Sequence, residues 1–320
     1  MQRSLWLLLA LVCFGGPVHA LDYPTKPVRI IVGWAPGGIA DVAARIVAHK
    51  LTEKWGQQVI VENRAGATGM IGAGVAARAP ADGYTLMLAA SPEVTTTPFI
   101  QKDAPKYFVD DFKPVVLVSI NPMALVANAN SPYQTVQALI EAAKKKPGVI
   151  PYSSSGVGSA PHLAGVVFEE ATGIKLQHVP YKGGGPAAIA VGTGEVPVGF
   201  VAVPGAVPLV QAGRMKVLGL TTAHRIPSKP DWPTLAEAGV PNFDYTVWTG
   251  LFVQKGVPDE IVKKLNADFT AVLAQPDVVK QLDALGAIAA DEPLAAFVER
   301  IKRDTRVNEA IVQKAHITNK

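Results

Sequence analysis

Two glycine-rich segments place backbone N–H groups and small polar side chains where a predicted strand gives way to a predicted helix. The first runs Trp34-Ala-Pro-Gly-Gly-Ile-Ala-Asp41, and the second runs Ser153-Ser-Ser-Gly-Val-Gly-Ser-Ala-Pro-His162. A helix N-terminus carries unpaired N–H groups and a partial positive charge, and glycine lets a ligand approach the backbone closely. Each segment is therefore a candidate anion site. Two such sites facing each other predict a clamp on one carboxylate.

In the first segment the glycines open the backbone, and the residues after them begin a helix with free N–H groups. The expected ligand contacts here are Gly37, Gly38, Ile39, Ala40 and Asp41. Trp34 is expected to form an aromatic wall of a cleft, although core packing explains it equally well. An ordinary strand-to-helix turn, with Asp41 as a favourable acid in the first helical turn, also remains open.

The second segment adds hydroxyl groups to the same design. Its expected ligand contacts are Ser154, Ser155, Gly156, Val157, Gly158, Ser159 and His162. Either Ser159 or Ala160 caps the helix that Pro161 begins. The segment lacks the G-x-x-x-x-G-K-[ST] pattern of nucleotide-binding loops and the G-x-S-x-G pattern of serine hydrolases. A secreted serine hydrolase using Ser155 or Ser159 with His162 and Asp41 stays open as the alternative, because an oriented imidazole takes a hydroxyl proton.

A third junction, at Tyr181, Lys182 and Gly183, offers a lysine as a cation for a second acidic group of the ligand. Ser91 and Pro204, each close behind a predicted strand, complete the candidate set. No metal site is expected, because the other histidines lack ligand spacing. No cofactor is expected either, since Gly72-Ala-Gly74 only partly matches a dinucleotide fingerprint and suits close helix packing.

The start of the chain predicts export. A short positive region ending at Arg3, an apolar stretch over residues 5–14 and the small-residue site Val18-His19-Ala20 form a signal peptide over residues 1–20. The single cysteine, Cys13, lies inside it. The mature chain is therefore expected in the periplasm, without disulfides or a cysteine nucleophile.

The elements that must position the candidate residues alternate between strand and helix. Strands are predicted over residues 28–34, 58–63, 84–90, 124–127, 150–153, 176–180, 196–201, 216–220 and 245–254. Helices are predicted over residues 40–54, 135–145, 161–172, 184–193, 205–212, 259–274, 277–285 and 293–314. Such alternation predicts an α/β protein with mostly parallel sheets, helices on both faces and ligands at the carboxyl ends of the strands.

The length of the mature chain favours two lobes. We expect residues 21–124 together with 245–320 to form the first lobe, and residues 125–244 the second. The formal net charge of +4 is small and the basic residues are scattered, so nucleic-acid binding is not indicated.

Several further motifs occur in a fixed order along the mature chain. They are Pro36-Gly-Gly-x-x-Asp41, Val61-Glu-Asn-Arg-x-Gly66, Asp82-Gly-Tyr-Thr-Leu86, Ser155-Gly-x-Gly-Ser159 and Val179-Pro-Tyr-Lys-Gly183. With these motifs the chain resembles the extracytoplasmic solute receptors of tripartite tricarboxylate transporters, the Bug receptor family. It departs from many relatives at Pro197, where an acidic residue is common, and at Trp34, where phenylalanine or another apolar residue is common.

The resemblance implies a two-lobed, Venus-flytrap receptor that closes on a carboxylated solute and delivers it to membrane subunits of the transporter without acting on it chemically. It also implies a monomer whose main-chain groups and ordered waters hold the carboxylate at residues 37–41 and 154–159. Dicarboxylates, tricarboxylates, acidic amino acids and aromatic acids are the candidate ligands, with Trp34 and Ile39 favouring an apolar or aromatic acid. A sensory receptor that presents its liganded state to a membrane kinase remains a further alternative.

Overall fold

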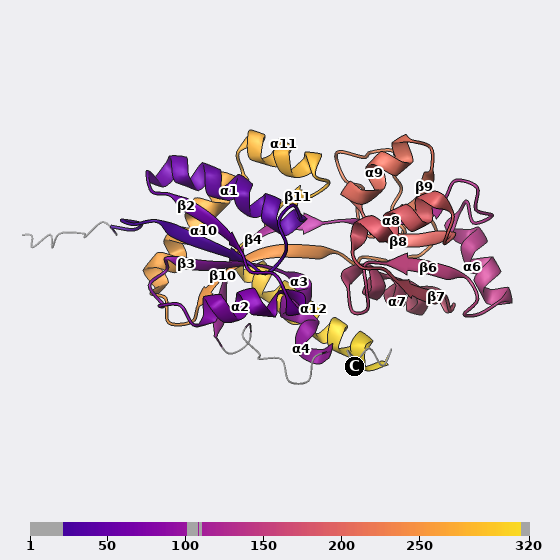
Figure 1. Cartoon of the computed structure of the whole chain (residues 1–320), viewed down its shortest axis with the longest axis horizontal. Helices are drawn as coiled ribbons and strands as arrows, with labels where there is room; N and C mark the ends of the chain where they lie inside the picture. The colour runs from indigo at the N-terminus through magenta and orange to yellow at the C-terminus, as the bar shows by residue number, and fades with distance from the viewer. Residues whose placement is uncertain (1–21, 101–107, 109–110, 315–320) are drawn as a thin grey trace, which may run out of the picture.

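The computed structural model describes residues 22–100, 108 and 111–314, so the predicted signal peptide lies outside the described residues. The chain forms two lobes side by side, each built around its own sheet (Figure 1). The first sheet has the strand order β11 (Ile288–Ala289), β4 (Phe112–Asn121), β10 (Val247–Gln254), β3 (Thr85–Ala90), β1 (Val28–Val32), β2 (Val59–Asn63). The second has the order β7 (Gln177–Pro180), β6 (Pro151–Ser154), β8 (Val198–Ala202), β5 (Met123–Asn128), β9 (Met215–Leu220).

Helices surround both sheets. Those of the first lobe are α1 (Ile39–Trp55), the short 3-10 turn η1 (Ala67–Gly69), α2 (Met70–Ala77), α3 (Ser91–Thr95), α4 (Thr97–Ile100), α10 (Asp259–Leu273), α11 (Pro276–Ala284) and α12 (Leu294–Lys314). Those of the second are α6 (Val136–Lys145), α7 (Ala160–Thr172), α8 (Gly184–Thr193) and α9 (Val203–Gln211). The two-lobed α/β architecture predicted from the sequence is confirmed.

The sheets are mixed, which corrects the expectation of mostly parallel sheets. Strands β1, β2 and β3 are parallel, as are β6, β7 and β8, because helices connect them. By contrast, β10 runs antiparallel to both β3 and β4, and β5 runs antiparallel to both β8 and β9. These strands carry the chain from one lobe to the other, so they enter each sheet from the opposite direction.

Buried strands explain why helices cover both faces of the first sheet. Along β1, Ile30 packs into a cluster with α1 and α10, whereas the next residue, Ile31, packs into a cluster with α2 and α12. Successive side chains of a strand point to opposite faces, so both faces of such a strand must be covered. Leu125 and Val126 of β5 divide between two clusters of the second lobe in the same way.

The lobes are joined at two places along the chain. Only Pro122 separates β4 from β5, and Val247, the first residue of β10, pairs with Asn121, the last residue of β4. Helix α12 also reaches the second lobe, where Ile311 and Val312 share a buried cluster with Leu163 of α7.

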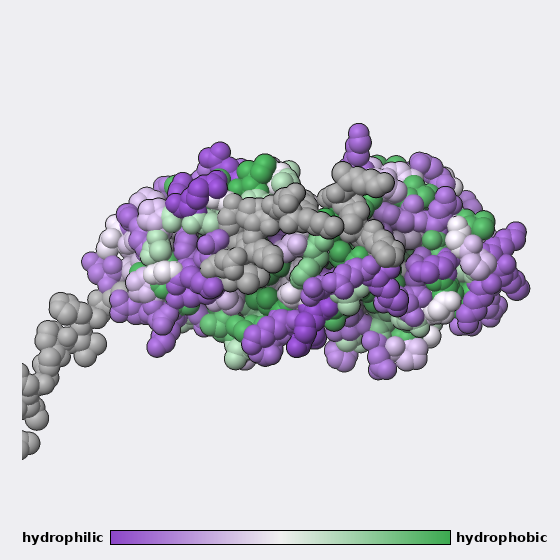
Figure 2. Space-filling view, turned by 90° about the horizontal axis from the view of Figure 1, so that it is seen from below, coloured by the Kyte–Doolittle hydropathy of each residue, from purple (hydrophilic) through white to green (hydrophobic). Residues whose placement is uncertain are grey.

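On the face shown in Figure 2, hydrophilic side chains are spread over both lobes, with apolar areas between them. Among the helices that the structure describes, none combines the length and the apolar character that a membrane span requires.

Candidate functional site

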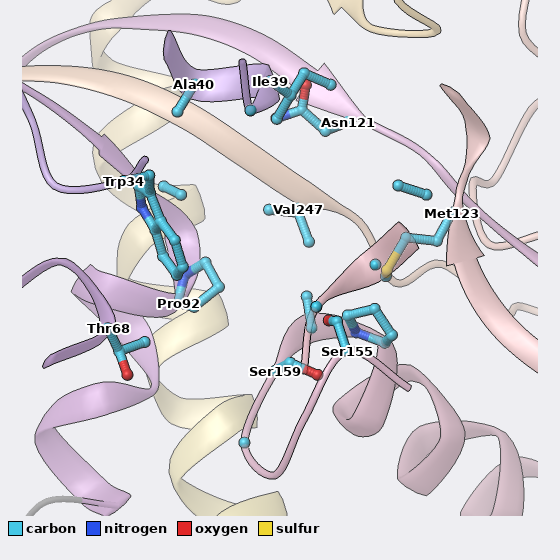
Figure 3. Close-up of a pocket in the computed structure, with 18 of the residues that line it drawn as sticks. Trp34, Ile39, Ala40, Thr68, Pro92, Asn121, Met123, Ser155, Ser159 and Val247 are labelled. Atoms are coloured by element: carbon cyan, nitrogen blue, oxygen red, sulfur yellow. The ribbon is translucent and has the colours of Figure 1, made fainter. Parts of the chain in front are cut away.

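A cavity of about 500 Å³ lies between the lobes. None of its lining residues, among the residues that the structure describes, carries an ionisable side chain. They are Trp34, Gly38, Ile39, Ala40, Thr68, Ala90, Pro92, Thr97, Ile100, Asn121, Met123, Ser155, Val157, Gly158, Ser159, Ala160, Pro161, Gly183, Gly184, Phe200, Val201, Ala202 and Val247. Figure 3 shows Trp34 on one side of this space, Met123 on the other, and Ser155 and Ser159 toward its lower edge.

Helix N-termini from both lobes meet at this cavity. The first residues of α1 lie on it, and so do those of α7 and α8 from the second lobe. Gly38 and Gly183, which precede α1 and α8, provide no side-chain cap, so their helices begin with N–H groups that no capping side chain satisfies. The cavity is therefore electropositive through its backbone although its side chains are neutral.

Asp41 shapes the first glycine segment from behind. It accepts hydrogen bonds from Gly37 N (2.9 Å to Oδ2), Asn63 Nδ2 (2.9 Å to Oδ1) and Arg45 Nε (3.2 Å to Oδ2). Burial alone would raise the pKa of this carboxyl, but the hydrogen bonds from Arg45, Gly37 and Asn63 outweigh it and hold the pKa below its usual range. Asp41 thus organises the loop and does not line the cavity.

The second glycine segment is held by its own side chains. Ser159 caps α7 by accepting from His162 N (3.4 Å), and its hydroxyl donates to Gly156 O (2.7 Å). Gly158 N donates to His162 Nδ1 (3.0 Å), so this ring nitrogen is unprotonated. Gly156 and Gly158 have φ values of 130° and 73°, which favour glycine.

His162 stacks on His178, with the ring centroids 3.8 Å apart. Burial lowers the pKa of His162 to about 4, with a further contribution from the neighbouring His178. Burial lowers the pKa of His178 to about 4 as well. Both rings are therefore neutral near pH 7.

The hydrolase alternative finds no support in this geometry. Among the described contacts, no hydroxyl of Ser155 or Ser159 reaches a ring nitrogen of His162, and Asp41 is engaged in the other lobe. The serine–histidine contact that does occur joins Ser154 Oγ and His178 Nε2 at 2.6 Å. Ser154 is fully buried and outside the cavity lining, so no substrate reaches that hydroxyl.

The third junction contributes backbone, not charge. Gly183 lines the cavity, whereas Lys182 is exposed outside it and Tyr181 turns away to donate to Glu195 (2.7 Å). Ser91 is buried and accepts from Trp248 N (3.4 Å), and Pro204 lies on the surface of α9.

Half of the expected contacts therefore form the lining: Trp34, Gly38, Ile39, Ala40, Ser155, Val157, Gly158, Ser159 and Gly183. The other expected contacts lie outside it: Gly37, Asp41, Ser91, Ser154, Gly156, His162, Tyr181, Lys182 and Pro204.

The floor of the cavity was not expected from the sequence. It comes from Asn121 and Met123, on either side of the β4–β5 crossing, and from Val247 at the start of β10. The apolar run Val115-Val-Leu-Val118 signals the buried strand that carries Asn121. Phe200, Val201 and Ala202 of β8 extend the apolar lining beside Met123, which pairs with Ala202.

Behind the tryptophan wall lies a buried carboxyl. Glu93 is fully buried and its Oε2 accepts from Ala90 N, whereas its Oε1 has no hydrogen-bond partner among the described residues. Burial raises the pKa of Glu93 to about 8, an effect that the hydrogen bond from Ala90 and the nearby indole of Trp34 only partly offset. The indole Nε1 is itself buried and does not meet hydrogen-bond geometry with Oε1.

Known proteins are similar to this chain in sequence and architecture. The model of the family described as "Tripartite tricarboxylate transporter family receptor" matches residues 43–315. The UPF0065 protein in the tcbD-tcbE intergenic region of Pseudomonas sp. (strain P51) is 36% identical over 301 residues, which cover 93% of this chain and 89% of that protein.

Two solved structures are similar over nearly their whole length. The R. palustris protein Rpa4515 with adipate is 31% identical, with a TM-score of 0.82, 93% of this chain covered and 99% of that chain. The periplasmic binding protein BugD is 30% identical, with a TM-score of 0.76, 93% of this chain covered and 100% of that chain.

Proposed function

Since the chain belongs to the tripartite tricarboxylate transporter receptor family, whose relatives include periplasmic binding proteins, we propose that it captures a small carboxylate between its lobes and delivers it to a tripartite transporter. One observation carries this proposal: the glycine-rich starts of α1 and α7, one from each lobe, line the same cavity and present no charged side chain to it. Such a site favours an anion through main-chain donors. The adipate bound by Rpa4515 supports the same ligand class.

Two-sided binding fits the energy that a receptor needs. A hydrogen bond to a charged group contributes about 1.5–3 kcal/mol. Micromolar affinity requires about 8 kcal/mol net of an association cost of several kcal/mol. One loop supplies too few donors for this, because Gly158 N and the Ser159 hydroxyl are engaged within their own segment, whereas the free N–H groups of both lobes together bring this affinity into range. Closure of the lobes would remove water and strengthen each of these bonds.

The proposal extends to the setting in which the protein works. The predicted signal peptide directs the chain to the periplasm, where it acts as a monomer and leaves its ligand chemically unchanged. The family membership supports a receptor without catalytic activity, and the separation of His162 from the cavity hydroxyls agrees with it.

A binding screen tests the ligand class. The purified protein, freed of any co-purified ligand, is heated with mono-, di-, tri- and aromatic carboxylates and with the matched uncharged amides. Ligands that bind only the folded state raise its melting temperature. An acid that raises it while its amide does not supports the proposal. No shift with any acid, together with turnover of generic esters, would contradict it.

A backbone substitution tests the mode of capture. Ile39 is the first residue of α1, and Gly38 before it is extended (φ −75°, ψ 164°), so proline fits at position 39 without breaking the helix. Ile39→Pro removes one N–H donor, whereas Ile39→Ala shortens the side chain and keeps the donor. We expect the proline variant to bind the acid about 10- to 100-fold more weakly than the alanine variant. Equal affinities in calorimetry would contradict main-chain capture at α1.

A further inference from the structure

Asn121 presents an unused hydrogen-bond donor at the floor of the cavity. Its side chain is 5% exposed, it lines the cavity, and its Nδ2 has no hydrogen-bond partner among the described residues. In the view of Figure 3, Asn121 lies beside Ile39 toward the upper edge of the cavity, away from Ser155 and Ser159. A buried donor without a partner destabilises the folded state, so the position calls for an acceptor.

A short polar chain engages the oxygen end of this amide. Ser119 Oγ donates to Asn121 Oδ1 (3.1 Å) and shares a hydrogen bond with Thr249 Oγ1 (2.7 Å). Ser119 and Thr249 are cross-strand partners of β4 and β10, and both are fully buried. With Oδ1 already engaged, the amide keeps Nδ2 as its free donor toward the cavity. A buried polar chain in an apolar core rigidifies the group at its end.

Among the described lining residues, Trp34 carries the second buried side-chain donor without a partner, and its surroundings differ from those of Asn121. Trp34 Nε1 lies near the carboxyl of Glu93, which is a protein acceptor. No comparable protein acceptor is described for Asn121 Nδ2. The lining also lacks any ionisable side chain among the described residues, so a second full charge at the floor would meet no cation.

Resting on the proposed carboxylate capture, we propose that Asn121 sets ligand specificity by donating a hydrogen bond from Nδ2 to a neutral oxygen acceptor at the far end of the ligand. The ligand is then a monocarboxylate. Its carboxylate binds the glycine-rich helix starts, its body packs on Met123, Phe200 and Val247, and its distal end carries a carbonyl or hydroxyl oxygen. Such a molecule gives Asn121 Nδ2 its acceptor and places no second charge at the floor.

Matched acids test this assignment. Straight-chain acids of four to eight carbons are compared by calorimetry in three forms: the plain alkanoate, the ω-amide monoacid and the α,ω-dicarboxylate. At the best length we expect the ω-amide to bind at least 10-fold more tightly than the alkanoate and more tightly than the dicarboxylate. A tenfold ratio corresponds to 1.4 kcal/mol, within the range of one hydrogen bond that also relieves a buried donor.

Substitutions assign the preference to one side chain. Asn121→Leu should reduce the amide-to-alkanoate ratio to below threefold, mainly by weakening the amide. Asn121→Ala also removes the donor. It should abolish the ratio as well, which keeps the test available if the leucine variant does not fold. Asn266→Leu is the matched control, because Asn266 Nδ2 donates to Val115 O of the same strand (2.7 Å) outside the cavity lining. The control should keep the ratio.

The outcomes separate the two proposals. Binding of acids without any preference for a distal acceptor overturns the role of Asn121 and leaves carboxylate capture standing. A preference that persists in Asn121→Leu or Asn121→Ala also overturns it. Tighter binding of the dicarboxylate than of the ω-amide overturns the neutral acceptor. If no acid binds the wild-type protein, carboxylate capture itself fails, and this inference fails with it.

Discussion

Glu93→Gln should change how the stability of the protein depends on pH. Glu93 is fully buried, and burial raises its pKa from 4.5 to about 8. In the unfolded chain the group ionises near pH 4.5, so between these values the folded state binds the proton more strongly. Stability contributed by Glu93 is therefore fully present below pH 4.5 and is lost as pH rises toward 8.

The magnitude follows from the two pKa values. Between pH 5 and pH 8 the loss is roughly 3–4 kcal/mol of unfolding free energy. For a chain of this size, at about 2 °C per kcal/mol, this corresponds to a change of roughly 6–8 °C in melting temperature. Glutamine retains the acceptor for Ala90 N and does not titrate. The variant should thus gain roughly 3–4 kcal/mol relative to wild type over the same interval.

Urea unfolding followed by tryptophan fluorescence at pH 5, 6, 7 and 8 measures this difference. Subtracting wild type from variant cancels the contribution of groups common to both, including the histidines. Glu141→Gln, a substitution on the exposed side of α6, controls for the loss of one carboxylate. Parallel pH profiles of wild type and Glu93→Gln would refute the argument, because they would mean that Glu93 ionises alike in the folded and unfolded states.

Three further predictions concern the two glycine-rich segments and His178, whose ring contacts Ser154. Asp41→Asn should lower the unfolding free energy by about 1–3 kcal/mol in urea titrations at pH 7. Because the pKa of Asp41 is lowered in the folded state, the difference between wild type and variant should shrink as pH falls below 4. A difference that stays constant with pH would argue against this role of Asp41. Gly158→Ala and Gly37→Ala should each cost about 1 kcal/mol of stability, because both glycines have a positive φ. The added Cβ at position 158 would also lie 2.6 Å from Ile100 Cδ1 and displace this lining side chain, so Gly158→Ala should weaken ligand binding in calorimetry more than Gly37→Ala, which has open space. Acidification from pH 6.5 to 4 should remove up to about 3 kcal/mol of stability through His178. The lowered pKa of this histidine stabilises the fold above pH 6.5, and this contribution is lost as pH falls through about 4. His178→Phe keeps the stacked ring and should flatten that part of the plot of melting temperature against pH, whereas an unchanged plot would count against the role of His178.

The glycine-rich junctions were predictable because their signals are local. A buried strand followed by glycines and a helix start places backbone donors at a sheet edge, and the ranges expected for α1, α7 and α8 agree with the structure to within a residue. The identity of the cap was left between Ser159 and Ala160, and the structure selects Ser159 because its hydroxyl accepts from His162 N.

What the sequence did not reveal depends on pairing between distant segments. The antiparallel strands β5 and β10 look like any apolar strand, since direction is decided by where the chain comes from. Asn121 was missed because its strand was not predicted, and its unpaired donor exists only once Ser119 and Thr249 meet across strands. Asp41 was expected at the ligand, but its three neighbours Gly37, Asn63 and Arg45 draw it to the back of the loop.

The two chain passages between the lobes have a mechanical consequence. Asn121 and Val247 are paired and lie on the floor of the cavity, so the pivot of any rotation between the lobes is adjacent to the bound solute. The outer edges of the lobes are then far from the pivot. A small rotation caused by a solute near the pivot gives a large displacement at these edges, so a membrane partner that contacts only the edges can distinguish the occupied from the empty protein without contacting the solute.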